Sequence, residues 1–339
     1  MLTPSSLNEA DAAKKVFAGF FPACFLDSRG PTGDNRRDPD ITTRVGIFMT
    51  MTGPEPEAWL PRVRHVVLDM DGTIYRGSQL FDVTLPFLER LRRLGIGYTF
   101  LTNNTARSRA DYLGKIRHLG IDVAEEQMYT AADSTIAHLR ASLPGVTRVA
   151  VLGTPSLVGQ FAEEGYDEDW EQPGAVVVGF DTTLTFERLC RAAYLIERGI
   201  PFLATHPDLV CPTDEPTVLV DCGALCACLT AATGRSPVVL GKPEPALLLD
   251  ICRRAGVRPG EAAMVGDRLY TDIAMGRRAG VPAVLVLTGE ATADEAADCP
   301  LPPDLVVADV GELGERLAAA RAAEPPAGGA ATPVAPRTP

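Results

Sequence analysis

The chain has 339 residues, of which 46% are hydrophobic, and its formal net charge is −12 at pH 7. At roughly 100–200 residues per domain, this length predicts two domains with some additional sequence, and a sizeable buried core. A strongly acidic chain repels the phosphate backbones of nucleic acids, so we expect no nucleic-acid partner. A small anionic substrate stays compatible with this charge, because a local site can be basic within an acidic protein.

The cysteines indicate a reducing compartment. They lack the even spacing of a disulfide framework and several lie in apolar runs, so we expect reduced, largely buried thiols in a cytoplasmic protein. Cys222, Cys226 and Cys228 lie close together, but no second ligand pair follows at a suitable spacing. This favours core positions on a helix over a metal site. The eight cysteines are Cys24, Cys190, Cys211, Cys222, Cys226, Cys228, Cys252 and Cys299.

No stretch of the sequence predicts a membrane partner. All apolar runs fall short of the roughly 18 residues that a spanning helix needs. The most apolar early stretch, residues 16–26, begins late and follows acidic residues. It also lacks a small-x-small cleavage site, which argues against a signal peptide.

Both ends of the chain differ from its middle. Residues 1–60 show no sustained period and include a polar, turn-rich segment, 28–40, so we expect a disordered N-terminal extension. Because Met49 and Met51 lie just before a plausible domain start, a start codon assigned too far upstream would explain the preceding residues equally well. The Pro/Ala/Gly-rich end, 323–339, is also expected to be disordered.

Between these ends, short apolar segments alternate with segments of helical spacing. The predicted strands are 65–68, 97–101, 149–152, 175–178, 202–204, 238–240, 263–265 and 283–286. The predicted helices are 85–94, 107–119, 186–198, 223–233, 246–255, 271–279 and 311–322. This alternation predicts an α/β fold with a doubly wound, mainly parallel sheet that is covered by helices on both faces.

Polar residues stand where several of the predicted strands end. They are Asp69, Thr102, Lys242 and Asp267. Ligands of parallel α/β sheets bind at the carboxyl ends of the strands. We therefore expect four strands of one sheet to deliver these four side chains to one edge.

Two carboxylates follow the first of these strands directly. Asp69 and Asp71 are two residues apart, and Gly72 permits the backbone turn that lets both enter one pocket. Neighbouring carboxylates repel each other, and a divalent cation removes that conflict. Mg²⁺ prefers such oxygen ligands, and Asp267 is the natural further carboxylate. Asp272 is expected to orient these ligands, to cap the helix that begins nearby, or both.

The same edge offers groups that can bind and transfer a phosphoryl group. A hydroxyl, two amides and an ammonium group could neutralise its oxygens; they belong to Thr102, Asn103, Asn104 and Lys242. Asp69 is the candidate nucleophile, which would form an aspartyl-phosphate. Asp71 would protonate the leaving oxygen and later deprotonate the hydrolytic water.

Four segments carry a resemblance to a known family. In order, residues 69–73, 101–104, 241–245 and 265–272 resemble the four motifs of the haloacid dehalogenase-like (HAD) phosphatase superfamily. The residues of these segments are similar to the motifs of one subgroup, which contains p-nitrophenyl, phosphoglycolate and pyridoxal phosphatases and NagD-like nucleotide phosphatases. The resemblance covers roughly residues 62–320 and implies a HAD-like Rossmannoid core.

The resemblance also implies a domain organisation. In this subgroup an α/β cap domain is inserted between the second and third motifs, which here gives a cap at residues 139–236. The catalytic core would then be discontinuous, with parts at residues 61–138 and 237–322. Such caps cover the active site and set the leaving group, and family members often pair through them. We therefore expect a small phosphorylated metabolite as substrate and a homodimer through the cap.

Roles transfer from the family position by position. The resemblance implies that Asp69, Asp267 and the backbone carbonyl of Asp71 bind Mg²⁺, and that Thr102, Asn103 and Lys242 hold the phosphate. It further implies a substrate loop in the cap at residues 204–208. There His206 stands where the family usually has Asn, and we expect it to contact the substrate.

The expected function is Mg²⁺-dependent hydrolysis of a small phosphate monoester. A phosphomutase of the same superfamily would use the same intermediate but return the phosphoryl group to a sugar. A non-catalytic binding protein would be expected to have lost one of Asp69, Asp71 and Asp267, and all three are present. The candidate substrates are sugar phosphates, phosphoglycolate, nucleoside monophosphates and pyridoxal phosphate.

Overall fold

The computed structural model describes residues 57–211 and 216–323. The predictions for residues 1–56 and 324–339 lie outside the described residues. Within the described residues, Trp59 and Leu60 are buried in the core, and Leu60 begins a short 3-10 helix, η1 (Leu60–Arg62). The folded part therefore starts before residue 61, the boundary expected from the sequence.

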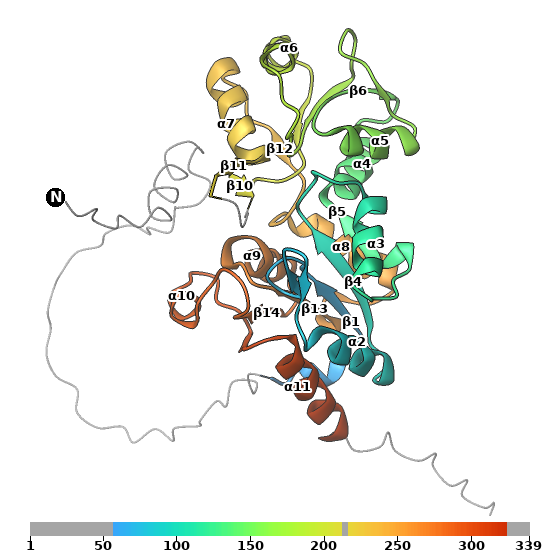
Figure 1. The fold of residues 1–339 in the computed structure, drawn as a ribbon, viewed down its shortest axis with the longest axis vertical. Helices are drawn as coiled ribbons and strands as arrows, with labels where there is room; N and C mark the ends of the chain where they lie inside the picture. Colours follow the sequence, from blue (N-terminus) through green and yellow to red (C-terminus); the bar gives the residue numbers. More distant parts are fainter. Residues whose placement is uncertain (1–56, 212–215, 324–339) are drawn as a thin grey trace, which may run out of the picture. The chain divides into compact units, whose positions relative to one another are not determined.

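The first sheet has six parallel strands in the order β15-β14-β13-β1-β4-β5 (Figure 1). They are β1 (His65–Leu68), β4 (Gly97–Thr102), β5 (Met128–Thr130), β13 (Ala262–Gly266), β14 (Ala283–Val286) and β15 (Leu305–Val307). The central strand β1 pairs with β13 on one side and β4 on the other. Because both faces of the sheet are covered, its strands are buried almost continuously rather than at alternate residues.

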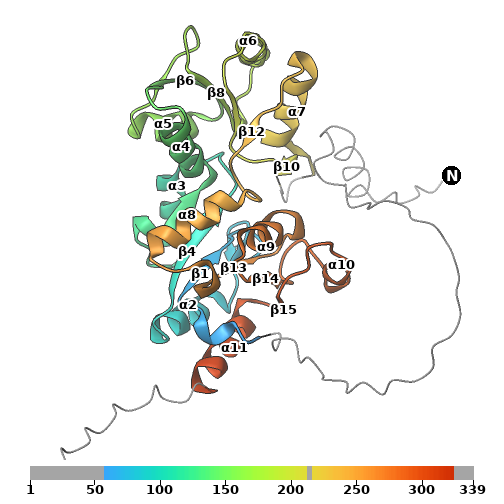
Figure 2. The ribbon, with the colours of Figure 1, turned by 180° about the vertical axis from the view of Figure 1, so that it is seen from behind.

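Helices cover the two faces of this sheet separately. Alternate residues of β1 show the division: Val66 packs with α2, α3 and α11, whereas Val67 packs with α8 and α9. Accordingly, α2 and α3 lie in front of the sheet in Figure 1, and α8 and α9 lie in front in Figure 2. The helices are α2 (Thr84–Arg93), α3 (Arg109–His118), α8 (Pro245–Ala255), α9 (Ala274–Ala279), α10 (Ala293–Ala297) and α11 (Val310–Ala323). Single turns link them: η2 (Glu125–Gln127), η3 (Pro259–Glu261) and the π turn η4 (Leu269–Ile273).

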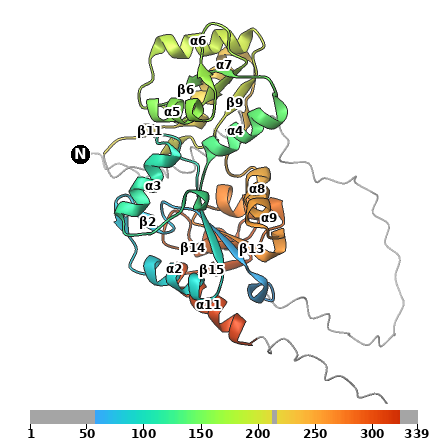
Figure 3. The same ribbon diagram turned by 90° about the vertical axis from the view of Figure 1, so that its right-hand side faces the viewer.

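A second parallel sheet lies between β5 and α8 in the chain. Its order is β12-β9-β8-β6-β7, and its strands are β6 (Arg148–Leu152), β7 (Asp167–Glu168), β8 (Ala175–Val178), β9 (Phe202–Ala204) and β12 (Val238–Val239). One face packs against α6 and α7, the other against α4 and α5 (Figure 3). These helices are α4 (Ala131–Ser142), α5 (Pro155–Glu163), α6 (Phe186–Glu197) and α7 (Cys222–Thr233). The predicted doubly wound α/β fold with a second, inserted α/β unit is confirmed.

One strand was assigned to the wrong sheet by the sequence. We expected residues 238–240 to join the first sheet, but β12 pairs with β9 of the second sheet, with Val238 opposite Leu203. An apolar run predicts a strand without specifying its partner, and this strand is only two residues long. The connection to α8 therefore leaves from the second sheet.

Two antiparallel hairpins complete the described structure: β2 (Tyr75–Arg76) with β3 (Gln79–Leu80), and β10 (Val210–Cys211) with β11 (Leu219–Val220). Among the described helices, none has the length and apolarity required to cross a membrane. The cysteines are less buried than expected: Cys222, Cys226 and Cys252 are buried, whereas Cys190 and Cys228 are exposed.

Candidate active site

Asp69 stands at the carboxyl edge of the first sheet. Its backbone N–H donates to the carbonyl of Val265 on the neighbouring strand at 2.9 Å, which fixes the point where the chain leaves β1. The side chain is buried and accepts two hydrogen bonds. Thr73 Oγ1 donates to Asp69 Oδ2 at 3.3 Å, and Lys242 Nζ donates to Asp69 Oδ1. Asp69 is thus held at the place predicted for the nucleophile.

Three carboxylates gather around this position. One oxygen from each of Asp69, Asp267 and Asp272 lies within 4.8 Å of the others. Burial and the neighbouring negative charges raise the pKa of both Asp267 and Asp272. Asp267 Oδ1 is also buried with no hydrogen-bond partner among the described residues. A buried carboxylate oxygen without a donor, beside two like charges, fits the hard oxygen ligands that Mg²⁺ prefers.

Two glycines let the neighbouring loops approach Asp267. A Cβ on Gly72 would lie 2.5 Å from Asp267 Oδ2, and its φ of +87° is itself disfavoured for other residues. A Cβ on Gly289, in the loop after β14, would collide with the same carboxylate. The sequence DMDGT therefore requires glycine at its fourth position for both conformation and space.

Lys242 supplies the positive charge of the site. Its Nζ bonds Asp69 and lies 2.7 Å from Asp272 Oδ1. Burial alone would lower the pKa of Lys242, but these two carboxylates raise it, so the group stays protonated. Lys242 follows β12, so the expectation that four strands of one sheet form the site is wrong. Asp69, Thr102 and Asp267 follow strands of the first sheet, whereas Lys242 follows a strand of the second.

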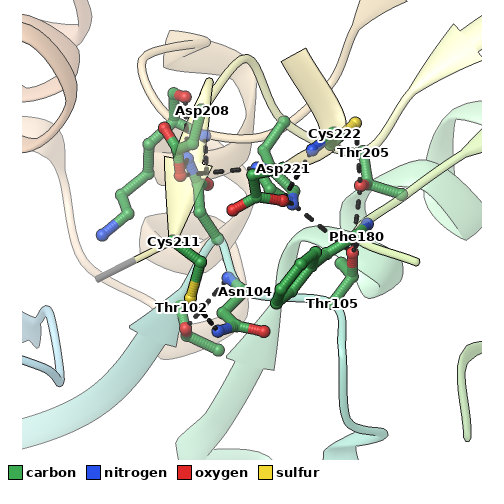
Figure 4. Close-up of polar contacts among 12 residues, drawn as sticks. Thr102, Asn104, Thr105, Phe180, Thr205, Asp208, Cys211, Asp221 and Cys222 are labelled. Carbon is green, nitrogen blue, oxygen red and sulfur yellow. Dashed lines mark hydrogen bonds and ion pairs between the residues drawn. The ribbon is translucent and has the colours of Figure 1, made fainter. Parts of the chain in front are cut away.

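The three residues after β4 hold the loops of the site together. Thr102 Oγ1 accepts from the backbone N–H of Asn104 at 3.2 Å. Asn103 bonds both backbone groups of Lys242, and the side chain of Asn104 bonds Cys211 Sγ at 3.4 Å (Figure 4). Both amides, which we expected to bind phosphate, therefore have partners inside the protein. The Thr102 side chain stands at the strand end, as expected.

Asp71 lies outside the group of three carboxylates. It is exposed, at the turn where its backbone bridges to Tyr75. Partial removal from water raises the pKa of its carboxyl, while the backbone of Gly77 and the charge of Lys115 oppose the rise. A carboxyl with a raised pKa retains its proton at higher pH, which suits the donor of a proton to a leaving group.

The structure does not support direct substrate contact by His206. The side chain has no exposed surface, and it lies between the carboxylates of Asp208 and Asp221. An expectation based on loop resemblance could not include Asp221, because that residue comes later in the chain, next to α7.

Arg268 is a site residue that the sequence analysis missed. Its side chain is only 18% exposed and forms an ion pair of 3.1 Å with Glu290. Its charge opposes the rise in the pKa of Asp71 and Asp267 and contributes to the lowered pKa of Asp208. Its place directly after Asp267 in the fourth motif was a signal that could have identified it.

Known proteins resemble this chain over most of its length. Residues 66–167 match the haloacid dehalogenase-like hydrolase family, and residues 239–313 match a HAD-hydrolase-like family. The 4-nitrophenylphosphatase of Thermotoga maritima has a similar structure, with 40% identity, a TM-score of 0.73 and coverage of 76% of this chain and 98% of that one. The 5′-nucleotidase YutF of Bacillus subtilis is 33% identical over 66% of this chain and 86% of its own length.

A third relative was crystallised with magnesium. It is the glycerol phosphate phosphatase of Mycobacterium tuberculosis, with 32% identity, a TM-score of 0.71 and coverage of 76% of this chain and 78% of that one. These identities extend over more than two thirds of the relatives' own lengths. The chain therefore belongs to the haloacid dehalogenase-like hydrolases.

Proposed function

We propose that this protein is a Mg²⁺-dependent phosphatase that hydrolyses a small phosphate monoester through an aspartyl-phosphate on Asp69. The observation that carries the proposal is the buried carboxylate of Asp69, bonded by Lys242 and grouped with Asp267 and Asp272 within 4.8 Å. Relatives that are named as phosphatases and a nucleotidase support the same reaction class.

The residues of the chain can be assigned to two chemical steps. In the first, a carboxylate oxygen of Asp69 attacks phosphorus, the bond to the ester oxygen breaks, and Asp71 gives its proton to that leaving oxygen. In the second, Asp71 takes a proton from water as the water attacks the aspartyl-phosphate, which releases phosphate and restores Asp69. Lys242 and the Thr102 hydroxyl neutralise the phosphoryl oxygens in both steps.

The carboxylate group fits the cation that the family implies. Asp69, Asp267 and the backbone carbonyl of Asp71 would hold Mg²⁺, and Asp272 lies close enough to the first two to position or join them. When bound, the ion would offset the repulsion among the carboxylates and the charge of the phosphoryl group. The unpaired Asp267 Oδ1 and the magnesium complex of the glycerol phosphate phosphatase support this assignment.

The second sheet and its helices are proposed to act as the cap that selects the ester. On this view the cap extends from α4 to β12, because α4 packs on the second sheet and β12 belongs to it, and the described residues before α4 and after β12 form the core. The names of the relatives favour small phosphorylated metabolites over phosphoproteins. A cytoplasmic location and a homodimer through the cap stay predictions, and a phosphomutase stays the alternative.

The proposal is tested by Asp69→Asn, with p-nitrophenyl phosphate as substrate and with or without Mg²⁺. We expect phosphate release from the wild type only with Mg²⁺, and a loss of about 10³-fold or more in the variant because Asn cannot form the acyl phosphate. Circular dichroism should show an unchanged fold. Full activity in the variant would rule out the mechanism, and a wild type that moves phosphate between sugar positions without releasing it would identify a mutase.

A further inference from the structure

A second buried cluster of titratable groups lies beside the site. His206, in the loop after β9, places Nδ1 3.4 Å from Asp208 Oδ2 and Nε2 3.5 Å from Asp221 Oδ1. Thr105, from the loop after β4, adds its hydroxyl 3.4 Å from Nε2. Figure 4 shows Asp208, Asp221 and Thr105 converging on this region from the second and first sheets. Each ring nitrogen thus has a carboxylate oxygen at ion-pair distance, while His206 Nδ1 and Asp208 Oδ1 have no hydrogen-bond partner among the described residues.

The surroundings favour the charged form of the imidazole. Burial alone would lower the pKa of His206, but Cys222, Asp221 and Asp208 raise it to about 9. The pKa of Asp208, which burial would raise, is instead lowered, mainly by His206. A neutral imidazole carries one N–H, whereas the charged form carries two and can donate to both carboxylates.

Asp208 connects this cluster to the catalytic lysine. Asn103 Nδ2 donates to Asp208 Oδ2 at 3.2 Å and to the backbone carbonyl of Lys242 at 3.1 Å. Asn103 Oδ1 accepts from the backbone N–H of Lys242 at 2.8 Å. The orientation of this one amide therefore depends on Asp208 and determines where the backbone of Lys242 lies. From there Lys242 Nζ reaches Asp69.

We propose that His206 is a positioning residue for the phosphatase reaction. It holds Asp208, Asp208 orients the amide of Asn103, and Asn103 fixes Lys242 against the nucleophile. The kinetic part of this inference rests on the proposed function. An Asn at this position would carry both of its N–H groups on one nitrogen and no charge, so pairing with a carboxylate on each side depends on histidine at position 206.

The same three residues raise the alternative of a second metal site, because one ligand atom of each lies within 4.8 Å of the others. The orientation of the ring argues against it. Nδ1 faces Asp208 and Nε2 faces Asp221, so the two carboxylates lie on different sides of the imidazole. One ion could take only one ring nitrogen, whereas a protonated ring can form an ion pair with both carboxylates.

The test combines single and double variants with p-nitrophenyl phosphate and saturating Mg²⁺. We expect His206→Ala to lower kcat about tenfold with little change in KM, because the lysine acts mainly on the transition state. His206→Gln, which keeps one donor, should recover part of the loss. His206→Ala with Asn103→Ala should lose no more than Asn103→Ala alone, since both act through the same amide.

His65→Ala is the matched control. This histidine is partly buried and bonded, with Nε2 2.9 Å from Thr99 Oγ1, but it begins β1 at the end opposite Asp69. It should lower stability without lowering the kcat of the folded enzyme. An unchanged kcat in His206→Ala, or losses that multiply in the double variant, would overturn the proposal.

Two further measurements do not depend on turnover. The imidazole NMR signal of His206, assigned by its loss in His206→Gln, should titrate near pH 9 in the wild type and at lower pH in Asp208→Asn. A wild type without phosphatase activity would reject the proposed function while this titration still tests the pairing. A tightly bound metal that survives chelation in the wild type and is lost in His206→Ala would replace the positioning role with a metal site.

Discussion

The two clusters of buried charge differ in how far their charges are compensated. At the edge of the first sheet, three carboxylates share the charge of Lys242, and Asp267 Oδ1 has no donor among the described groups. In the second cluster, an imidazole lies between two carboxylates, each at ion-pair distance from a ring nitrogen, although His206 Nδ1 and Asp208 Oδ1 also lack a hydrogen-bond partner among the described residues. The larger excess of buried negative charge indicates a place for a cationic ligand, whereas a cation held between two carboxylates indicates a part that holds others in position.

The largest effect should come from removing Lys242, the cation that bonds Asp69 and Asp272 in the first cluster. Lys242→Ala is expected to lower kcat with p-nitrophenyl phosphate by about 10²–10³-fold, because the phosphoryl oxygens lose a buried positive charge. The variant should also be less stable, since Asp69 and Asp272 lose their partner. Lys115→Ala, which removes a lysine of α3 near Tyr75, is the control and should retain far more activity. Equal losses in both would contradict the assignment of Lys242 to the site.

Asp267→Asn should separate the needs of catalysis from those of stability. Asn keeps an acceptor for the Glu290 backbone N–H but removes a negative charge. We expect activity to fall about 10²-fold and to require more Mg²⁺, because a charged ligand is lost. In the absence of metal, the Tm should rise, because the raised pKa of Asp267 shows that its ionised form is disfavoured in the fold. A lower Tm without metal would contradict the view of an uncompensated cluster.

The first cluster could be predicted largely from sequence, because its residues lie within short motifs that each follow a strand. Asp69 and Asp267 were expected at one sheet edge, and the order of β13, β1 and β4 brings them there. Lys242 was predicted as a site residue but with the wrong sheet. The apolar pattern of 238–240 contains no information about which strand it pairs with.

The second cluster could not be predicted, because its contacts join separate parts of the chain. His206 and Asp221 are brought together only by the return of the chain from β9 to α7. The helices α4 and α5 were also missed, although α5 carried a clear local signal. Thr154 caps that helix by accepting from the N–H of Leu157, and Pro155 occupies its first position. Capping residues would have identified this helix where the apolar spacing did not.

Asp221→Asn should affect the second cluster without removing a helix cap. Asp221 accepts from the N–H of Cys222 at the start of α7, and an amide oxygen can do the same. Burial raises the pKa of Asp221, so its ionised form is disfavoured in the fold, and loss of its charge should leave the Tm unchanged or slightly higher at neutral pH. The kcat should fall by a few-fold, because His206 loses one of its two partners. Asp181→Asn, which breaks the buried pair of Asp181 with Arg188, is the control. It should lower stability but leave kcat unchanged.

The smallest effect should be a dependence of stability on alkaline pH. The pKa of His206 is raised from its ordinary value of 6.5 to about 9, so its charge stabilises the fold fully below pH 6.5 and this contribution is lost as the pH rises through about 9. Groups that face the ring are Asp208 from its own loop, Asp221 and Cys222 from α7, and Thr105 from the first sheet. The Tm of the wild type should therefore fall more steeply between pH 8 and 10 than that of His206→Gln. Parallel Tm profiles in this range would show that the imidazole is neutral and that the two clusters do not differ in compensation.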